Sequence, residues 1–289
     1  MSVSLNTAAS ARPFPAKAAL APADDDGASA LLRVENVTLQ YRAEGSVVTA
    51  ARNVSFTMDR SDRLVLLGPS GCGKSTLLKA LGGFIRPAEG TITLRGRPVR
   101  GPGPDRMFVF QEFEQLLPWK TVLQNVVFVL TAAVGMSRQE AEARAALYLH
   151  KVGLTQFAAA YPHTLSGGMK QRAAIARCLA ASPEVILMDE PFAALDALTR
   201  ERMQQELLRL WNDSRFTMVF VTHSITEAIR LGSRILLLSP HPGRVVGEIT
   251  VPPDLRDGSP EFLSLQNRIH AQLFGDNFSD AERTGVSHP

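Results

Sequence analysis

A glycine-rich octapeptide between an apolar run and a helical pattern constrains this chain more than any other feature. Residues 68–75 read Gly-Pro-Ser-Gly-Cys-Gly-Lys-Ser and fit the pattern G-x-x-x-x-G-K-[ST]. The apolar run Arg63–Leu67 before it predicts a buried strand, and Ser75–Leu81 after it has helical spacing that ends at Gly82-Gly83. A strand, a tight glycine loop and a helix in this order favour an α/β fold with a phosphate-binding loop.

The backbone N–H groups of such a loop point at phosphate oxygens, and the helix N-terminus adds a partial positive charge. Lys74 would reach the β- and γ-phosphates of a bound nucleotide, and Ser75 would offer its hydroxyl to Mg²⁺. By itself the octapeptide could also be a simple glycine-rich turn. The expected nucleotide-binding residues of this loop are Gly68, Pro69, Ser70, Gly71, Cys72, Gly73, Lys74, Ser75 and Thr76.

A second apolar run ends in two carboxylates. Glu184–Met188 predicts a buried strand, and Asp189 and Glu190 follow it directly. Because α/β folds bind ligands at the carboxyl ends of their strands, Asp189 would hold Mg²⁺ and Glu190 would act as general base on the attacking water. The pair could instead be an acidic turn before the next helix, but its combination with the phosphate loop argues against that alternative.

Residues 165–172, Leu-Ser-Gly-Gly-Met-Lys-Gln-Arg, resemble the signature motif of ATP-binding cassette (ABC) ATPases. The resemblance covers about residues 31–250 and departs from the usual motif at Met169. It implies that Ser166, Gly167 and Gly168 bind the γ-phosphate held by a partner subunit, which agrees with anion binding at a helix N-terminus. The remaining family positions are matched in the same way. Tyr41 matches the aromatic residue that stacks on adenine, and Gln111 matches the glutamine of the Q-loop. Asp196 matches the D-loop aspartate, and His223 matches the switch histidine.

The resemblance therefore implies three sets of site residues, each with an ordinary structural alternative. Tyr41 could be a core aromatic of a strand, Gln111 a solvated loop amide, His223 a histidine at a strand end and Ser166 a helix N-cap. The catalytic set is Glu190, His223 and Gln111, the Mg²⁺ set is Ser75, Gln111 and Asp189, and Ser166–Gly168, Asp196 and Tyr41 join the nucleotide-binding set.

The order of elements predicts a parallel α/β core that carries an inserted helical block. Gln139–Val152 has helical spacing at Ala143, Ala146, Leu147 and His150. Further strands are expected at Val37–Tyr41, Val54–Met58, Thr91–Leu94, Met107–Phe110, Met218–Thr222 and Ile235–Leu238. With the resemblance, the fold is a P-loop NTPase of the ABC ATPase type, with an antiparallel β subdomain and an α-helical subdomain.

Three segments divide the chain. Residues 1–30 are rich in Ala, Ser and Pro and predict a disordered tail without the apolar core of a secretory signal. The resemblance implies an ATPase domain over residues 31–250, with the helical subdomain inserted at about residues 112–180. Residues 251–289 are a C-terminal extension with an amphipathic helix whose apolar face is Phe262, Leu265, Ile269 and Leu273.

Composition excludes several classes of protein. The net charge of +3 and the lack of a Lys/Arg run argue against nucleic acid as a partner. Two cysteines cannot build a disulfide framework, so a reducing compartment is expected. No apolar run reaches the ~18 residues that cross a bilayer, so we expect no membrane-spanning segment.

The resemblance also implies partners. One phosphate loop and one signature in the chain make half of each composite site, which predicts a two-fold homodimer. Short matches at residues 101–106, 116–119 and 238–244 resemble the nitrate/sulfonate/taurine group of ABC importers, in which a transmembrane permease and a periplasmic or extracellular substrate-binding protein complete the system. The chain would lie peripherally on the cytoplasmic face of the inner (plasma) membrane.

Other functions stay open at this point. The chain could be the ATPase of a different importer or a non-transport regulatory ATPase. A kinase would have no reason to carry the signature motif, and a chromosome-maintenance cassette would need a long coiled-coil insertion or zinc cysteines, which the sequence lacks.

Three side chains, those of Cys72, Cys178 and Trp119, carry further expectations. Lys74 and the helix N-terminus should favour the thiolate of Cys72, whereas Cys178 should be a buried, slower thiol. Trp119 follows Phe113, Leu116 and Leu117. It either packs the helical block against the core or lies in a groove that receives a helix of the permease.

Overall fold

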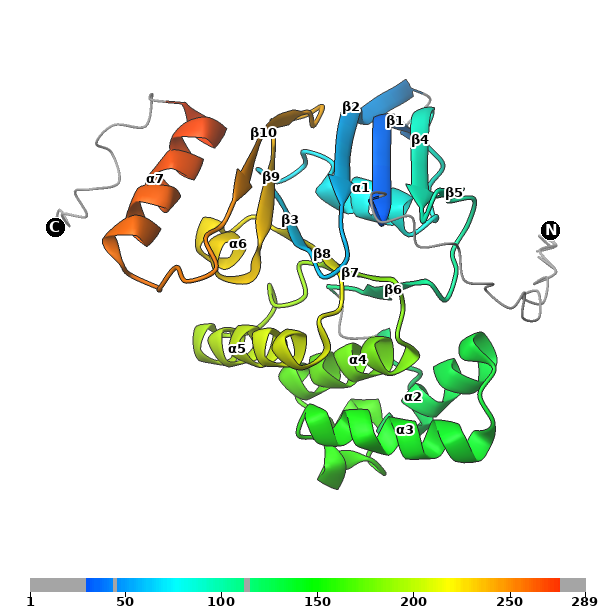
Figure 1. The fold of residues 1–289 in the computed structure, drawn as a ribbon. Helices are drawn as coiled ribbons and strands as arrows, with labels where there is room; N and C mark the ends of the chain where they lie inside the picture. Colours follow the sequence, from blue (N-terminus) through cyan, green and yellow to red (C-terminus); the bar gives the residue numbers. More distant parts are fainter. Residues whose placement is uncertain (1–29, 44–45, 112–114, 276–289) are drawn as a thin grey trace, which may run out of the picture.

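A computed structural model describes residues 30–43, 46–111 and 115–275 of the chain. This part contains two sheets, a helical block, a C-terminal helix and three further helices (Figure 1). The expected N-terminal tail up to residue 29 lies outside the described residues, as does Phe113.

The central sheet has six strands in the order β10-β9-β3-β8-β7-β6. All neighbours are parallel except β10, which is antiparallel to β9. The strands are β3 (Arg63–Leu67), β6 (Arg106–Val109), β7 (Val185–Asp189), β8 (Met218–Thr222), β9 (Arg234–Leu238) and β10 (Val245–Thr250). Sequence reasoning missed β10, in which only Ile249 is buried.

The central strands are buried on both faces, because their residues alternate between two hydrophobic cores. On β3, Val65 and Leu67 enter one core and Leu64 and Leu66 enter the other. The first core holds the helical block and the C-terminal helix, and the second holds the antiparallel sheet and α1 (Lys74–Leu81). The continuous apolar run at 63–67 therefore marks a strand with helices on both sides.

The second sheet is antiparallel, in the order β2-β1-β4-β5. Its strands are β1 (Leu32–Ala43), β2 (Ser46–Met58), β4 (Glu89–Leu94) and β5 (Arg97–Pro98). β1 begins five residues before the expected strand because its register shifts between Val34 and Val37, where Asn36 has a φ of 50°. This bulge breaks the two-residue alternation that sequence reasoning follows.

The helical block lies below the central sheet in Figure 1. It contains α2 (Val122–Val129), the π-turn η2 (Leu130–Val134), α3 (Arg138–Lys151), the 3₁₀ turns η3 (Thr155–Phe157) and η4 (Pro162–Thr164), and α4 (Gly167–Ala181). The expected helix is present as α3, but the residues that showed its spacing do not form its buried face. Ala141, Ala145 and Leu149 are buried, whereas Ala143, Ala146, Leu147 and His150 are exposed, because small alanines let α3 pack closely on α2 and α4.

The remaining helices are α5 (Ala197–Ser214), α6 (Ile225–Leu231) and α7 (Pro260–Phe274). α7 packs on α6 and β10 (Figure 1), and its expected apolar face of Phe262, Leu265, Ile269 and Leu273 is buried. Within the described ranges, no helix has the length and apolar character to span a bilayer.

Candidate active site

The expected functional residues of four strands meet at one edge of the central sheet. Leu67 pairs with Thr222, so the phosphate loop begins beside His223. Asp189 pairs with Val221 on the other side of β8, which places Glu190 at the level of Thr222. Gln111 follows β6, whose Val109 pairs with Met188. Parallel pairing alone therefore gathers the loop, the carboxylates, the histidine and the glutamine at the carboxyl edge.

The phosphate loop closes against the antiparallel sheet. Gly73 is the N-cap of α1 with a φ of 91°, and a Cβ there would lie 2.5 Å from the carbonyl oxygen of Ala50. Only glycine accepts both this left-handed backbone and this close approach. The loop thus delivers Lys74 and Ser75 as the first residues of α1, one residue earlier than the expected helix start.

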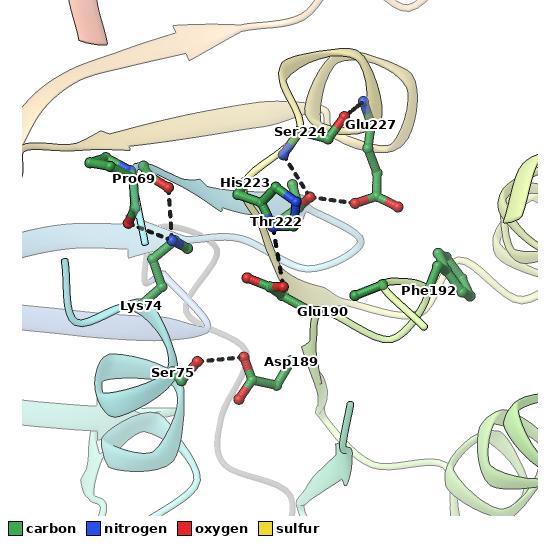
Figure 2. A network of polar contacts seen from close by, with 12 residues as sticks. Pro69, Lys74, Ser75, Asp189, Glu190, Phe192, Thr222, His223, Ser224 and Glu227 are labelled. Carbon is green, nitrogen blue, oxygen red and sulfur yellow. Dashed lines mark hydrogen bonds and ion pairs between the residues drawn. The ribbon is translucent and has the colours of Figure 1, made fainter. Parts of the chain in front are cut away.

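Lys74 is buried and its ammonium group lies inside the loop (Figure 2). Its Nζ donates to the carbonyl oxygens of Gly68, at 2.7 Å, and Pro69, at 2.9 Å. An ammonium group has three donors and no acceptor. The contacts hold the cation at the first turn of α1, where a phosphate would also meet the N-terminal N–H groups of the helix.

Ser75 and Asp189 form the second contact of the site. Ser75 Oγ donates to Asp189 Oδ1 at 2.8 Å. Burial raises the pKa of Asp189, and the hydrogen bond from Ser75 and the charges of Lys79 and Lys74 oppose this effect. A hydroxyl and a carboxylate oxygen side by side are ligands that Mg²⁺ accepts together with phosphate oxygens and water. The donor set therefore fits Mg²⁺.

Glu190 and His223 form the third contact. Glu190 Oε2 lies 3.2 Å from His223 Nδ1 (Figure 2). The φ of Glu190 is 41°, a left-handed conformation that costs a non-glycine residue about 1–2 kcal/mol. The backbone N–H of Glu190 donates to Val221 O at 3.1 Å and holds this conformation in place. A strained backbone at the end of β7 thus accompanies the contact between the carboxylate and the histidine.

The expectation for Cys72 was wrong. Its side chain is buried, and this burial raises the pKa of the thiol, although Lys74 acts in the opposite direction. Desolvation is the larger effect on this pKa, although Lys74 Nζ lies 3.8 Å from Cys72 Sγ. Cys178 is buried as expected, and burial raises the pKa of its thiol to about 11.

The signature residues lie apart from the phosphate loop of the same chain. Ser166 is the N-cap of α4 and accepts a hydrogen bond from the N–H of Met169. α4 belongs to the core on one face of the central sheet, and α1 belongs to the core on the other. Gly167 and Gly168 begin α4, so their N–H groups lie at its N-terminus, remote from Lys74.

The D-loop aspartate lies next to the signature. Asp196 is the N-cap of α5, and the hydrogen bond from the N–H of Thr199 lowers its pKa. A Cβ on Gly168 would lie 3.2 Å from Thr199 Cγ2, so the starts of α4 and α5 are in close contact. Ser166 and Asp196 are thus neighbours at two adjacent helix N-termini.

Tyr41 and Gln111 lie within the described ranges, where no hydrogen bond or ion pair links either of them to the other site residues. Tyr41 lies on β1 and is 48% exposed, so the core alternative for this aromatic was wrong. Gln111 is exposed at the sheet edge directly before residues outside the described ranges. Stacking of Tyr41 on adenine and contact of Gln111 with Mg²⁺ stay predictions.

Trp119 is a surface residue. Its side chain is 70% exposed, which rules out the expectation that it packs the helical block against the core. Leu116 of the same loop is buried, and Asn125 holds the loop because its side chain accepts from the N–H of Leu117 at 2.7 Å and donates to the carbonyl oxygen of Leu117 at 3.1 Å. The segment that Asn125 holds therefore presents an apolar ring to solvent at Trp119.

Sequence reasoning missed two buried polar residues near the site. Glu227 accepts the hydroxyl hydrogen of Thr222, the residue before His223 (Figure 2). Gln204 of α5 donates to the other oxygen of Glu227 at 2.8 Å. The Ser-x-x-Glu spacing at residues 224–227, typical of a helix start, could have drawn attention to Glu227.

Comparison with protein-family models finds a match to the ABC transporter family over residues 51–193. Among curated proteins, the taurine import ATP-binding protein TauB of Rhizobium johnstonii (strain DSM 114642 / LMG 32736 / 3841) is 46% identical over 254 residues, or 84% of this chain and 96% of that protein. The bicarbonate transport ATP-binding protein CmpD of Synechocystis sp. (strain ATCC 27184 / PCC 6803 / Kazusa) is 43% identical over 252 residues, or 84% of this chain and 89% of that protein.

Among solved structures, a dimeric post-hydrolysis state of the ATP-binding cassette MJ0796, bound to ADP and Pi, is similar to this chain with a TM-score of 0.66. The sequences are 35% identical, and the match covers 76% of this chain and 99% of that one.

Proposed function

Because the chain belongs to the ABC transporter family of ATP-binding subunits, we propose that it drives the uptake of a small anion through a separate permease. It is an ATPase, and its cofactors are ATP and Mg²⁺. The observation that carries the proposal is the assembly of Lys74, the Ser75–Asp189 pair and the Glu190–His223 pair at one sheet edge. ATP hydrolysis there supplies the energy for transport.

In the proposed binding mode, the phosphates of ATP lie in the loop of residues 68–76. Lys74 directs its ammonium to the β- and γ-phosphates, where a charge-assisted hydrogen bond is roughly twice as strong as a neutral one. Ser75 and Asp189 hold Mg²⁺, and Gln111 joins them. When bound, Mg²⁺ neutralises charge on the β- and γ-phosphate oxygens. Tyr41 stacks on the adenine.

Glu190 performs the proton transfer. A water oxygen attacks the γ-phosphorus, the bond from phosphorus to the β,γ-bridging oxygen breaks, and ADP and phosphate leave. The Glu190 carboxylate accepts the proton of the water. His223, 3.2 Å from that carboxylate, orients it and contacts the γ-phosphate. The positive φ of Glu190 supports this role, because strained residues persist where the surrounding structure holds them for function.

A second copy completes each site. Ser166, Gly167, Gly168 and Asp196 lie at helix N-termini on the opposite side of the sheet from α1, so they would face the ATP of a partner subunit. Their N–H groups then add anion-binding capacity that the phosphate loop of one chain lacks. The dimeric form of the similar cassette structure supports this arrangement. We therefore propose a two-fold homodimer.

The transported substrate is a small anion or zwitterion such as a sulfonate, taurine, nitrate or bicarbonate. The two relatives named above are a taurine import and a bicarbonate transport ATP-binding protein. They therefore support a class of substrate and do not single out one compound. The permease and a periplasmic or extracellular binding protein select the compound. In this role the chain lies peripherally on the cytoplasmic face of the inner (plasma) membrane, and no nucleic acid takes part.

The test is reconstitution with the permease that co-purifies with this chain. We expect the complex in proteoliposomes to hydrolyse ATP faster when its binding protein carries one of taurine, an alkanesulfonate, nitrate or bicarbonate. The Glu190→Gln variant serves as the control without hydrolysis. A complex that transports none of these compounds while the free subunit hydrolyses ATP would rule out the small-anion importer. The ATPase assignment would stand.

A further inference from the structure

His223 is held by a one-residue connection. Thr222 is the last residue of β8, and Ser224 is the N-cap of α6. The backbone N–H of Ser224 donates to Thr222 Oγ1 at 3.0 Å, and Ser224 Oγ accepts from the N–H of Glu227 at 3.3 Å. The hydrogen bond to the Thr222 hydroxyl thus closes a small ring that includes the backbone of His223.

Glu227 fixes the direction of that hydroxyl. Thr222 Oγ1 donates to Glu227 Oε2, and Glu227 is a buried residue (Figure 2). A hydroxyl has one hydrogen to donate, and an ionised carboxylate only accepts. The hydrogen of Thr222 is therefore committed to Glu227, and its lone pairs remain for the N–H of Ser224. Without Glu227 the hydroxyl could rotate and weaken the ring around His223.

The chain of hydrogen bonds that begins at Thr222 and Glu227 continues to the C-terminal extension. Gln204 Nε2 donates to Glu227 Oε1 at 2.8 Å, which leaves Gln204 Oε1 to accept from Arg230 Nη1 at 2.7 Å. Arg230 Nε donates to Asp257 Oδ2 at 2.7 Å. Gln204 is buried, and its two ends are not interchangeable, because the carboxylate needs the amide N–H. Each bond therefore has one possible direction.

We propose that Thr222, Glu227, Gln204, Arg230 and Asp257 are positioning residues for His223, and that Asp257 joins the C-terminal extension to ATP hydrolysis. This inference rests on the ATPase function proposed for the site. The chain of bonds links three elements, β8, α6 and α5, with the segment before α7. Loosening it at either end lets His223 move away from Glu190 and slows the chemical step, while the phosphate loop still binds ATP.

The first test compares two substitutions at Thr222 in the full chain. Thr222→Val keeps the shape but loses the hydroxyl, so kcat for ATP hydrolysis should fall about tenfold or more while KM for ATP stays within about twofold. Thr222→Ser keeps the hydroxyl and should restore most of the rate. A loss of ATP affinity with unchanged kcat in Thr222→Val would overturn the proposal.

The second test uses the exposed end of the chain of bonds, where folding is not at risk. Asp257→Ala should lower kcat about threefold to tenfold, because Arg230 loses a charge-assisted partner. Asp254→Ala removes an exposed carboxylate three residues away and is the matched control, which should keep the rate of the parent protein. Equal rates for Asp257→Ala, Asp254→Ala and the parent protein would refute the link to the C-terminal extension.

The third test asks whether these residues act through His223. In a His223→Ala background, Thr222→Val and Asp257→Ala should cause no further loss of rate, since the residue that they position is absent. Additive losses would show a general structural role and overturn the proposal. The parent protein and His223→Ala alone test the ATPase function separately, so a failure there is distinguishable from a failure of the positioning network.

Discussion

The hydroxyl of Ser75 donates a 2.8 Å hydrogen bond to Asp189 Oδ1, between residues 114 positions apart in the sequence. α1 packs on β7, so the first turn of the helix meets the end of the strand. The glycine-rich loop and the carboxylates after β7 could each be an ordinary turn when taken alone. This contact joins them into one site with adjacent oxygen atoms of the kind that Mg²⁺ prefers. The same sheet edge carries Glu190 and His223, and Glu190, the proposed base, directly follows Asp189, a proposed Mg²⁺ ligand.

Lys74→Ala should weaken ATP binding by about 10- to 150-fold. The substitution removes a charge-assisted contact worth ~1.5–3 kcal/mol, and a carbonyl cage without its cation repels phosphate. Equilibrium binding of a fluorescent ATP analogue measures the change. Lys79→Ala, at an exposed position of the same helix, is the control for loss of one positive charge. Unchanged affinity in Lys74→Ala would contradict the phosphate-loop assignment.

Glu190→Gln should separate binding from chemistry. The amide keeps the shape but does not accept a proton, so hydrolysis should drop by ~10²–10⁴-fold while ATP still binds. With hydrolysis blocked, ATP should hold the variant as a closed dimer. Size-exclusion chromatography with and without MgATP measures this. A variant that binds ATP and elutes as a monomer in both runs would argue against the composite site.

The two tryptophans should respond in opposite ways to truncation. Trp211 is 8% exposed, with the guanidinium groups of Arg63 and Arg215 each 4.1 Å from its ring centre, so Trp211→Ala should destabilise the fold by about 3–5 kcal/mol. Trp119 is 70% exposed, so Trp119→Ala should change stability by less than about 0.5 kcal/mol. Chemical denaturation of both variants measures the difference.

Trp119→Ala should also leave the basal ATPase rate intact and weaken assembly with the permease. An aromatic anchor of an interface is often worth ~2–4 kcal/mol. Co-purification of the variant with the permease is the readout. Normal assembly and transport by Trp119→Ala would show that the exposed ring is not part of the permease contact.

Both thiols should react slowly with a maleimide in the native protein at neutral pH. Burial raises the pKa of each, so the thiolate fraction and the access are both low. Single variants Cys72→Ser and Cys178→Ser, analysed by mass spectrometry, assign the rates, and denatured protein is the control for full reactivity. Labelling of Cys72 at the rate of a free thiol would restore the sequence-based expectation of an activated cysteine.

Cys178 should make stability decrease at high pH. Its thiol has a folded pKa of about 11, above the ordinary value of 9.0, so the contribution is full below pH 9 and is lost as the pH rises from 9 to 11. The difference corresponds to roughly 3 kcal/mol. The free energy of unfolding, measured by chemical denaturation at pH 8, 9, 10 and 11, should decrease less steeply with pH for Cys178→Ala than for the parent protein. Parallel curves would contradict a buried, protonated thiol.

Most strands of the central sheet could be found from sequence, because burial on both faces leaves a continuous apolar run, as in 64–67 and 185–188. Strand β10 could not be found, because only its Ile249 is buried. The start of β1 could not, because the bulge at Asn36 shifts its register. The buried face of α3 could not be predicted from the sequence either. Alanines occupy several of its faces, and only packing against α2 and α4 selects Ala141 and Ala145.

The sequence by itself determined the family, the phosphate loop and most proposed site residues, because glycines, a lysine and carboxylates at fixed spacing serve phosphate chemistry that few arrangements perform. Only the tertiary structure decided which side chains touch. It paired Glu190 with His223, buried Cys72, exposed Trp119 and linked Thr222 to Asp257 through Glu227. The physical reason is that spacing along a chain records local chemistry, whereas burial and hydrogen bonds between distant residues depend on how strands pair and helices pack.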